Sequence, residues 1–258
     1  MIFTIGSTIV RGKYQIMDFL GQGGFGEVFK AFDTQLEREV AIKVIQRGPG
    51  SSSDEYHDYE ERFKQEAKIG ANVRDDNVIA VYGLEQEEDK LVLVTEYAAG
   101  GSLAKKILKA ALSPAEVLEL GAQLCKGVAA IQRPPVSGVH RDIKPSNILF
   151  DDLGRAKVAD LGLVQISGMS GRSMDFAGKH PGSPGYMSPE QERETSYLRP
   201  ASDVYAIGCV LFEALTQKMY QSLPAGTKLS SLVENVPLEL EAVIEKALAQ
   251  EVDQRYVD

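Results

Sequence analysis

The spacing of apolar residues changes near residue 100, and this change constrains the fold more than any other feature of the chain. Before it, apolar residues gather in short β-rich runs at residues 14–20, 27–33, 40–44, 78–84 and 90–97. A Gly/Pro/Ser loop at residues 48–53 precedes a charged segment, residues 58–71, that reads as a helix. The first hundred residues therefore predict a small sheet with one helix.

After Ser102 the apolar residues follow a helical period. Ser113, Pro114 and Glu116 form a capping box with proline at the first helical position, which predicts a helix from residue 114 to about 131. Further helices are expected at residues 201–216 and 237–249. The second of these should place one set of apolar residues on one side: Leu238, Leu240, Val243, Ile244 and Leu248.

This order of elements predicts an α+β fold with two lobes. We expect a β-rich N-lobe at about residues 10–97, a hinge at about residues 96–101, and a larger, mostly helical C-lobe at about residues 102–258. A cleft between two lobes is a common place for a ligand.

Composition excludes several classes of protein. The chain has 258 residues and a net charge of -9, which argues against a general surface for nucleic acid or anionic membranes. Its cysteines, Cys125 and Cys209, lie in apolar helical stretches and are expected to be reduced core thiols. No apolar run is long enough to cross a bilayer, since Glu213 interrupts the best candidate, and no basic N-terminal targeting region is present. We therefore expect a cytoplasmic protein.

Residues 140–147, with the sequence HRDIKPSN, carry the clearest chemical signal, together with Asp160. Transfer of a phosphoryl group to a hydroxyl needs a carboxylate that accepts the proton, and Asp142 suits this task. Asn147 and Asp160 offer the oxygen ligands that Mg²⁺ prefers when phosphates and water complete its shell. Lys144 lies two residues after Asp142, where its charge can reach the transferring phosphate. A simple turn would explain any one of these residues, but not all eight in order.

A second motif, G-x-G-x-x-G-x-V, begins at Gly21 and continues through Gly23, Gly26 and Val28. Glycines let backbone N–H groups approach phosphates closely. A dinucleotide-binding turn would require a helix directly after the glycines, whereas residues 27–33 read as a strand. Lys43 follows on the next strand, and Glu66 on the predicted helix can pair with it.

Together these motifs resemble the eukaryotic-type (Hanks-type) Ser/Thr protein kinases, most closely the bacterial branch, over about residues 10–257. The resemblance implies the bilobal kinase fold, ATP and Mg²⁺ as cofactors, and protein substrates. It implies that Asp142 is the catalytic base, that Lys144 and Asn147 assist it, that Lys43 pairs with Glu66, and that Asn147 and Asp160 bind the metal. The residues that it places around the nucleotide are Leu20, Gly21, Gly23, Gly26, Val28, Ala41, Lys43, Thr95, Glu96, Ala98 and Leu149.

The same resemblance implies supporting roles. Asp203 would brace the catalytic loop, and Glu190 would pair with Arg255. Residues 182–190 resemble the loop that receives the peptide, with Ser183 where the family usually has threonine. Lys144 indicates Ser/Thr rather than Tyr acceptors.

Regulation is implied as well. Arg141 would bind a phosphate on the activation segment, residues 162–186. We expect autophosphorylation there, with Ser167, Ser170 and Ser173 as candidate sites.

Three features depart from the family pattern. Leu161 replaces a phenylalanine, a swap between apolar residues. Gly70, four residues after Glu66, replaces a bulky apolar residue, so we expect a mobile helix and an ion pair that forms only part of the time. The chain stops soon after Arg255, so we expect the C-terminal end of the domain to be incomplete.

Two alternatives to an active protein kinase stay open on these departures. A pseudokinase or nucleotide-binding scaffold is conceivable, but the intact Lys43, Asp142, Asn147 and Asp160 favour an enzyme. A small-molecule kinase is disfavoured by the peptide-loop resemblance. The oligomeric state, the physiological substrate and the activating signal are not predicted.

Overall fold

The computed structural model describes residues 1–23, 26–45, 53–161, 165–166, 183–193, 198–224 and 226–257. The chain forms two compact units. The first comprises Met1–Arg74 and Ile79–Ala99, and the second comprises Asp75–Val78 and Gly100–Asp258. The chain leaves the first unit for the last time after Ala99, within the segment where the sequence predicts a hinge.

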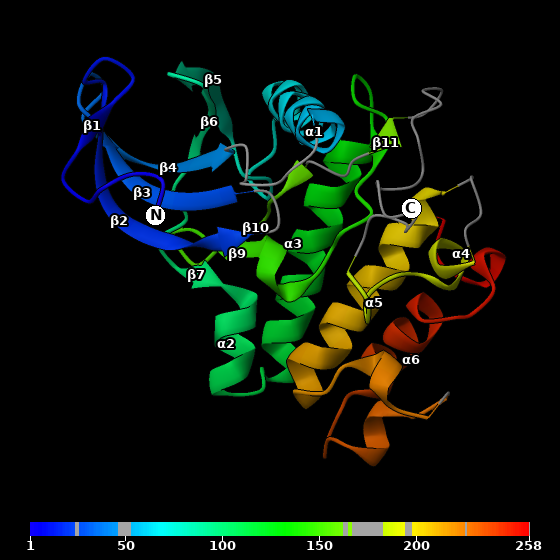
Figure 1. The fold of residues 1–258 in the computed structure, drawn as a ribbon. Helices are drawn as coiled ribbons and strands as arrows, with labels where there is room; N and C mark the ends of the chain where they lie inside the picture. Colours follow the sequence, from blue (N-terminus) through cyan, green and yellow to red (C-terminus); the bar gives the residue numbers. More distant parts are fainter. Residues whose placement is uncertain are drawn as a thin grey trace. The chain divides into compact units, whose positions relative to one another are not determined.

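The first unit is built on a six-stranded antiparallel sheet with the order β1-β2-β3-β4-β6-β5. Its elements are β1 (Thr8–Ile9), β2 (Tyr14–Gly23), β3 (Gly26–Asp33), β4 (Arg38–Ile45), α1 (Ser53–Asn72), β5 (Val81–Glu87) and β6 (Lys90–Glu96). The curved ribbon of β1 to β4 is drawn in blue in Figure 1, with α1 in cyan. Helix α1 contacts β4, β5 and β6. The strands predicted at residues 14–20, 27–33, 40–44 and 90–97 and the helix predicted at residues 58–71 are confirmed.

Side chains alternate across this sheet as the period of a β-strand requires. Along β3, buried residues alternate with partly exposed ones. The buried set joins residues of neighbouring strands in one apolar core, which includes Phe29, Ile42 and Val94, each at most 1% exposed. The sequence prediction that residues 78–80 open β5 is wrong. Val78 instead forms a parallel bridge with Val158 and belongs to the second unit.

The second unit is mostly helical. Its helices are α2 (Leu103–Lys109), α3 (Pro114–Gln132), α4 (Pro189–Glu192), α5 (Pro200–Thr216) and α6 (Leu238–Ala247). Short strands and single helical turns complete it: β7 (Gly101–Ser102), β8 (Gly138–Val139), η1 (Pro145–Asn147), β9 (Ile148–Phe150), β10 (Ala156–Val158), β11 (Gln165–Ile166), η3 (Tyr220–Ser222), η4 (Leu229–Ser231) and η5 (Val252–Gln254). Helix α5 packs against both α3 and α6. The fold class is α+β, as expected.

The predicted start of α3 is confirmed in detail. Ser113 Oγ accepts a hydrogen bond from the Glu116 N–H at 3.3 Å, and Glu116 Oε2 accepts one from the Ser113 N–H at 2.8 Å. The two ends of the box thus satisfy each other's backbone groups.

Two predictions about burial are wrong. On α6 and at its C-cap, Leu240, Ile244 and Leu248 are buried, whereas Leu238 and Val243 are 75% and 45% exposed. Leu240, Ile244 and Leu248 repeat every four residues and share a stripe, and Leu238 and Val243 lie outside it. Cys209 is buried in α5 as expected, but Cys125 is exposed on α3 rather than part of the core.

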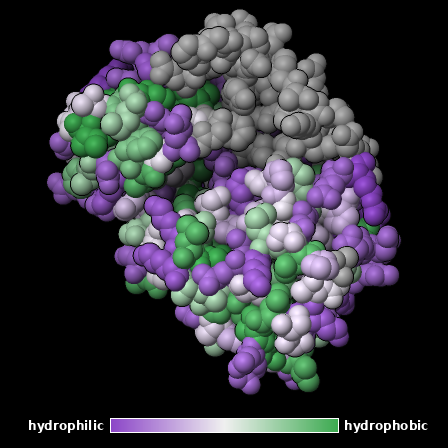
Figure 2. Space-filling model, turned by 60° about the horizontal axis from the view of Figure 1, so that its bottom comes forward, coloured by the Kyte–Doolittle hydropathy of each residue, from purple (hydrophilic) through white to green (hydrophobic). Residues whose placement is uncertain are grey.

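Polar and apolar residues are interspersed on the face of the molecule shown in Figure 2. Among the described residues, no helix is both long enough and apolar enough to cross a membrane.

Candidate active site

Four of the residues assigned to the nucleotide lie together on one face of the first unit's sheet. Val28 is directly opposite Lys43 in the β3–β4 pair, and Ala41 is opposite Thr95 in the β4–β6 pair. Residues directly opposite each other in antiparallel strands point to the same face, and so do residues two apart on one strand. All four are partly exposed. The apolar residues beside them along the strands are buried in the core: Phe29, Val40, Ile42, Val44 and Val94. The structure thus gathers an apolar surface beside one lysine.

The glycine motif lies at the end of the sheet where β2 ends and β3 begins. Gly21 and Gly23 end β2, Gly26 begins β3, and Gly23 is paired with Gly26 across the turn. Gly26 has φ of 144°, and a Cβ there would lie 1.9 Å from the Val44 carbonyl oxygen. Any side chain at position 26 would collide with this oxygen, and the positive φ angle also favours glycine. Leu20 lies at an irregularity of the β2–β3 pairing and is 38% exposed.

The ion pair predicted between Lys43 and Glu66 is formed. Lys43 Nζ lies 2.7 Å from Glu66 Oε2, with the two side chains 18% and 8% exposed. The Phe63 ring, one turn before Glu66 on α1, lies 5.9 Å from the ammonium. A partly buried pair of this kind holds the lysine in one position far better than an exposed pair would. The mobility of α1 expected from Gly70 stays a prediction.

The remaining nucleotide residues are divided between the units. Glu96 ends β6 and donates its N–H to the Ala80 carbonyl oxygen at 2.9 Å, and Ala98 follows in irregular backbone. Leu149 lies on β9 in the second unit, partly exposed between the buried Ile148 and Phe150. The adenine-binding roles of these residues stay predictions.

Three side chains converge on the Asp142 carboxylate in the second unit. Oδ2 accepts a hydrogen bond from Asn147 Nδ2 at 3.0 Å and lies 2.8 Å from Lys144 Nζ. Oδ1 accepts a hydrogen bond from Ser183 Oγ at 2.8 Å, and Lys144 Nζ donates to the same Ser183 Oγ at 2.6 Å. Asp142 is 7% exposed. A nearly buried carboxylate is thus held in one orientation by an ammonium, an amide and a hydroxyl.

Asn147 and Asp160 fit the donor set that Mg²⁺ requires. Asn147 Nδ2 donates to both the Asp142 carboxylate and the Asp142 carbonyl oxygen, at 3.0 and 2.9 Å. These two bonds fix the amide so that Oδ1 is the atom left for a cation. Asp160 is partly exposed, directly after the Ala159 N–H that donates to the Asn147 carbonyl oxygen at 2.8 Å. An amide oxygen and a carboxylate are hard ligands of the type Mg²⁺ takes together with phosphates and water.

Asp203 holds the start of residues 140–147, the segment that the resemblance expects it to brace. From α5 its carboxylate accepts the His140 N–H at 2.9 Å, the Arg141 N–H at 3.0 Å and Gln132 Nε2 at 3.1 Å. Burial raises the pKa of this carboxyl, against the opposing effects of the neighbouring His140 and of its hydrogen bonds. The backbone just before Asp142 is therefore hydrogen-bonded to α5.

Two residues of the site have strained backbone. Arg141 has φ of 73° and Asp160 has φ of 66°, a region that residues other than glycine occupy infrequently. Such conformations persist where surrounding contacts enforce them, and they cluster at functional sites. Arg141 directly precedes Asp142, the candidate base, and Asp160 is itself a candidate metal ligand.

The segment after Ser183 is fixed by contacts that the sequence analysis missed. Tyr186 donates its hydroxyl to Glu213 Oε2 at 2.5 Å, and burial followed by this bond raises the pKa of Tyr186. Gln191 Nε2 donates to the Arg141 carbonyl oxygen at 3.1 Å. The bridge that Ser183 makes between Asp142 and Lys144 was also missed, although its position in the peptide loop was the available signal.

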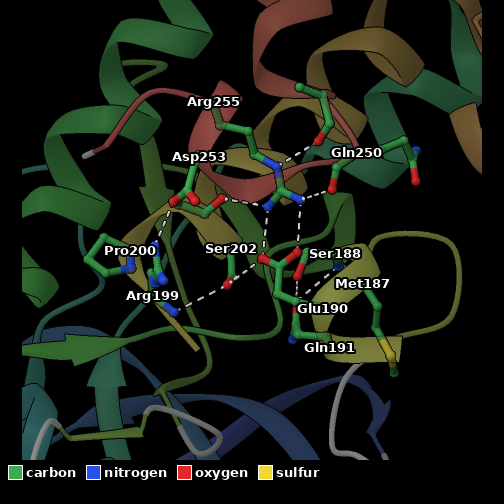
Figure 3. A network of polar contacts seen from close by, with 12 residues as sticks. Met187, Ser188, Glu190, Gln191, Arg199, Pro200, Ser202, Gln250, Asp253 and Arg255 are labelled. Atoms are coloured by element: carbon green, nitrogen blue, oxygen red, sulfur yellow. Dashed lines mark hydrogen bonds and ion pairs between the residues drawn. The ribbon is translucent and has the colours of Figure 1, made fainter. Parts of the chain in front are cut away.

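The predicted pair of Glu190 and Arg255 is confirmed and is shown in Figure 3. The guanidinium meets the carboxylate with two bonds of 2.8 Å, and the Arg255 side chain is fully buried. Ser202 Oγ adds a third bond to Glu190 at 2.8 Å. Burial acts to raise the pKa of Glu190, but the bonds from Arg255 and Ser202 outweigh it, so the pKa is lowered. This ion pair joins residue 190, at the end of the peptide loop, to residue 255.

The candidate phosphorylation sites Ser167, Ser170 and Ser173 lie outside the described residues, as does most of the activation segment.

Comparison with known proteins gives a consistent result. Residues 14–255 match the family described as Protein kinase domain. The chain is 33% identical over 260 residues to serine/threonine-protein kinase PrkC of Bacillus subtilis, covering 96% of this chain and 39% of PrkC. It is 31% identical over 265 residues to serine/threonine-protein kinase PknL of Mycobacterium tuberculosis, covering 98% of this chain and 64% of PknL.

It is also 31% identical over 261 residues to serine/threonine-protein kinase PknB of Mycobacterium tuberculosis, covering 95% of this chain and 41% of PknB. The chain thus spans less than two thirds of each of these relatives. With the family matched over nearly its whole length and the motif residues arranged as described, the chain belongs to the protein kinase family, among the Hanks-type Ser/Thr kinases of bacteria.

Proposed function

We propose that this chain transfers the γ-phosphate of ATP to serine and threonine hydroxyls of proteins, with Mg²⁺ as its metal ion. The observation that carries this proposal is the set of contacts around Asp142: an ammonium, an amide and a hydroxyl hold one nearly buried carboxylate. A scaffold without turnover has no need of this arrangement.

Asp142 is the general base in this proposal. The Ser183 hydroxyl, which now donates to Oδ1, shows that this oxygen can accept a hydrogen bond from an alcohol. An acceptor hydroxyl bound there would pass its proton to the carboxylate as its oxygen bonds to the γ-phosphorus and the bond to ADP breaks. Lys144, 2.8 Å from the same carboxylate, would stabilise the negative charge on the phosphoryl group in transfer.

The other residues bind and orient the nucleotide. Lys43, held by Glu66, would contact the phosphates, and Val28, Ala41 and Thr95 would contact the base. Asn147 Oδ1 and the Asp160 carboxylate would hold Mg²⁺, which when bound neutralises charge on the phosphate oxygens.

The acceptor class follows from Lys144 and from the Ser/Thr kinases to which the chain is similar. We also propose that the chain phosphorylates serines of its own activation segment, with Arg141 as the residue that would bind the added phosphate. We place this activity in the cytoplasm, where ATP is available.

The test is transfer of label from γ-labelled ATP and Mg²⁺ to a generic protein substrate, followed by acid hydrolysis of the product. Labelled phosphoserine or phosphothreonine is expected. Phosphotyrosine alone would overturn the acceptor class, and ATP binding without any transfer would favour a pseudokinase. Phosphopeptide mapping of the chain itself tests autophosphorylation, and an unmodified activation segment would contradict it.

A further inference from the structure

The first residues of the chain pack across the face of the sheet that lies opposite Lys43. We call residues 2–9 the N-terminal strap. Within it, Ile2 and Phe3 pack against the apolar core of the first unit, and Ile9 is 3% exposed within that core. This arrangement ties the start of the chain to the strands that carry the glycine motif.

The strap is joined to β2 by backbone hydrogen bonds. The Gly6 N–H donates to the Ile16 carbonyl oxygen at 2.8 Å, and the Ile16 N–H donates to the Ser7 carbonyl oxygen at 2.9 Å. Thr8 and Ile9 then pair with Gln15 and Tyr14 as β1. These bonds give the strap a fixed register on the sheet.

At its other end the strap contacts the first residues of β3. The Ile2 N–H donates to the Glu27 carboxylate, and the Met1 nitrogen lies 3.4 Å from Glu27 Oε1. The Phe3 ring lies 5.7 Å from the Phe29 ring, which is fully buried and also meets Phe19 at 5.6 Å. The strap thus donates a hydrogen bond to the buried Glu27 carboxylate and places a ring against the buried Phe29 ring.

These contacts fix a strand whose other face bears the nucleotide residues. Glu27 is 9% exposed and directly follows Gly26, while Val28, between Glu27 and Phe29, points to the opposite face with Lys43. Gly26 is itself in close contact with the Val44 carbonyl oxygen. Gly21, Gly23 and Gly26 have no side chains with which to hold their place. Their position therefore depends on where β3 is held.

We propose that the N-terminal strap is a positioning element for the phosphate-binding glycine motif, acting through Glu27 and Phe29. This inference rests on the proposed function, because it assigns the strap a role in binding ATP. Loss of the strap's contacts with β3 should weaken binding of the phosphates and leave binding of the nucleoside unchanged.

The test compares binding of MgATP and of adenosine by titration calorimetry. In Glu27→Ala and in Phe3→Ala, the Kd for MgATP should rise about five- to tenfold, roughly the effect of losing one ordinary hydrogen bond, while the Kd for adenosine should not change. Glu27→Gln and Phe3→Leu should restore most of the affinity, because glutamine keeps an acceptor oxygen and leucine keeps an apolar contact. Glu39→Ala is the matched control, since this carboxylate on β4 is 44% exposed and pairs with Lys30.

Equal MgATP affinity in Glu27→Ala, Phe3→Ala and the wild type would overturn the strap's role. Equal weakening of MgATP and adenosine would also overturn it, because it would show general damage to the unit. If Glu27→Ala does not fold, the comparison of Phe3→Ala with Phe3→Leu decides the question. A wild type that binds MgATP no better than adenosine would overturn the proposed function itself.

Discussion

Ser183 donates its hydroxyl to Asp142 Oδ1 at 2.8 Å while its oxygen accepts a hydrogen bond from Lys144 at 2.6 Å. Ser183 therefore links the Asp142 carboxylate to the Lys144 ammonium. In Ser183→Ala we expect kcat to fall about tenfold, because both groups lose a bond that orients them. Ser183→Thr should keep most of the activity, since the hydroxyl remains. Steady-state kinetics with varied ATP check this, and an alanine variant as active as the wild type would contradict it.

The ion pair of Lys43 and Glu66 should matter for catalysis far more than for stability. In Glu66→Gln we expect kcat/KM for ATP to fall about ten- to hundredfold, because the ammonium is no longer held toward the phosphates. Glu61→Gln is the matched control, as this carboxylate is on the same helix and pairs with Lys64 in an exposed position. Similar kinetics for the two variants would show that the pair is not used.

Helix α1 should be the least stable long helix of the chain. Gly70 weakens a helix by about 1 kcal/mol relative to alanine. The glycines of α3 and α5 differ from it in having a packing role, since Gly121 lies against Leu211, Gly127 against Asn77, and Gly208 against Ala247 and Leu248. We therefore expect amides of α1 to exchange with solvent faster than those of α3 and α5, and Gly70→Ala to slow this exchange. Hydrogen exchange followed by mass spectrometry is the measurement. Equally slow exchange in the three wild-type helices would defeat the expectation.

Because of the pair of Glu190 and Arg255, the free energy of unfolding should decrease as the pH falls into the acid range. Folding lowers the pKa of Glu190 from its ordinary value of 4.5, so the folded state favours the ionised carboxylate. Its contribution is complete above pH 4.5 and is lost as pH falls through the lowered pKa. Glu190→Gln should destabilise the protein by about 3 to 5 kcal/mol at neutral pH, because it leaves a buried guanidinium without its counter-charge.

Denaturant unfolding of wild type and Glu190→Gln between pH 3 and 7 tests this, and the difference between them should shrink toward the acid end. Asp253→Asn provides the control. Its pair with Arg199 is exposed, at 58% and 82%, and should be worth about 0 to 1 kcal/mol. A difference of constant size across the whole range would contradict the account.

Local patterns predicted most of the secondary structure because their causes are local. The capping box at Ser113 and the alternation along β3 depend on residues only a few positions apart. The errors arise where partners are distant in sequence. Val78 bridges to Val158 instead of continuing β5, and the two residues of β1 find their place only through contacts with β2.

The same distinction applies to the site. Motifs identified Asp142, Asn147 and Lys43 because each occupies a fixed place in a short pattern. Three other contacts join segments that are distant in sequence: the bond of Ser183 to Asp142, of Gln132 to Asp203, and of Tyr186 to Glu213. No local pattern encodes them. The exposure of Leu238 and Val243 likewise depends on which stripe of α6 packs on α5.

We propose that Asp142 is the base of a phosphoryl transfer, and the deciding experiment compares wild type with Asp142→Asn in transfer of labelled phosphate to a protein substrate, with the Kd for MgATP measured in both. Because asparagine cannot accept the proton, the transfer rate should fall by about 10² to 10⁴ while the Kd for MgATP stays close to that of the wild type. Equal transfer rates for the two proteins, or no transfer by either despite ATP binding, would contradict it.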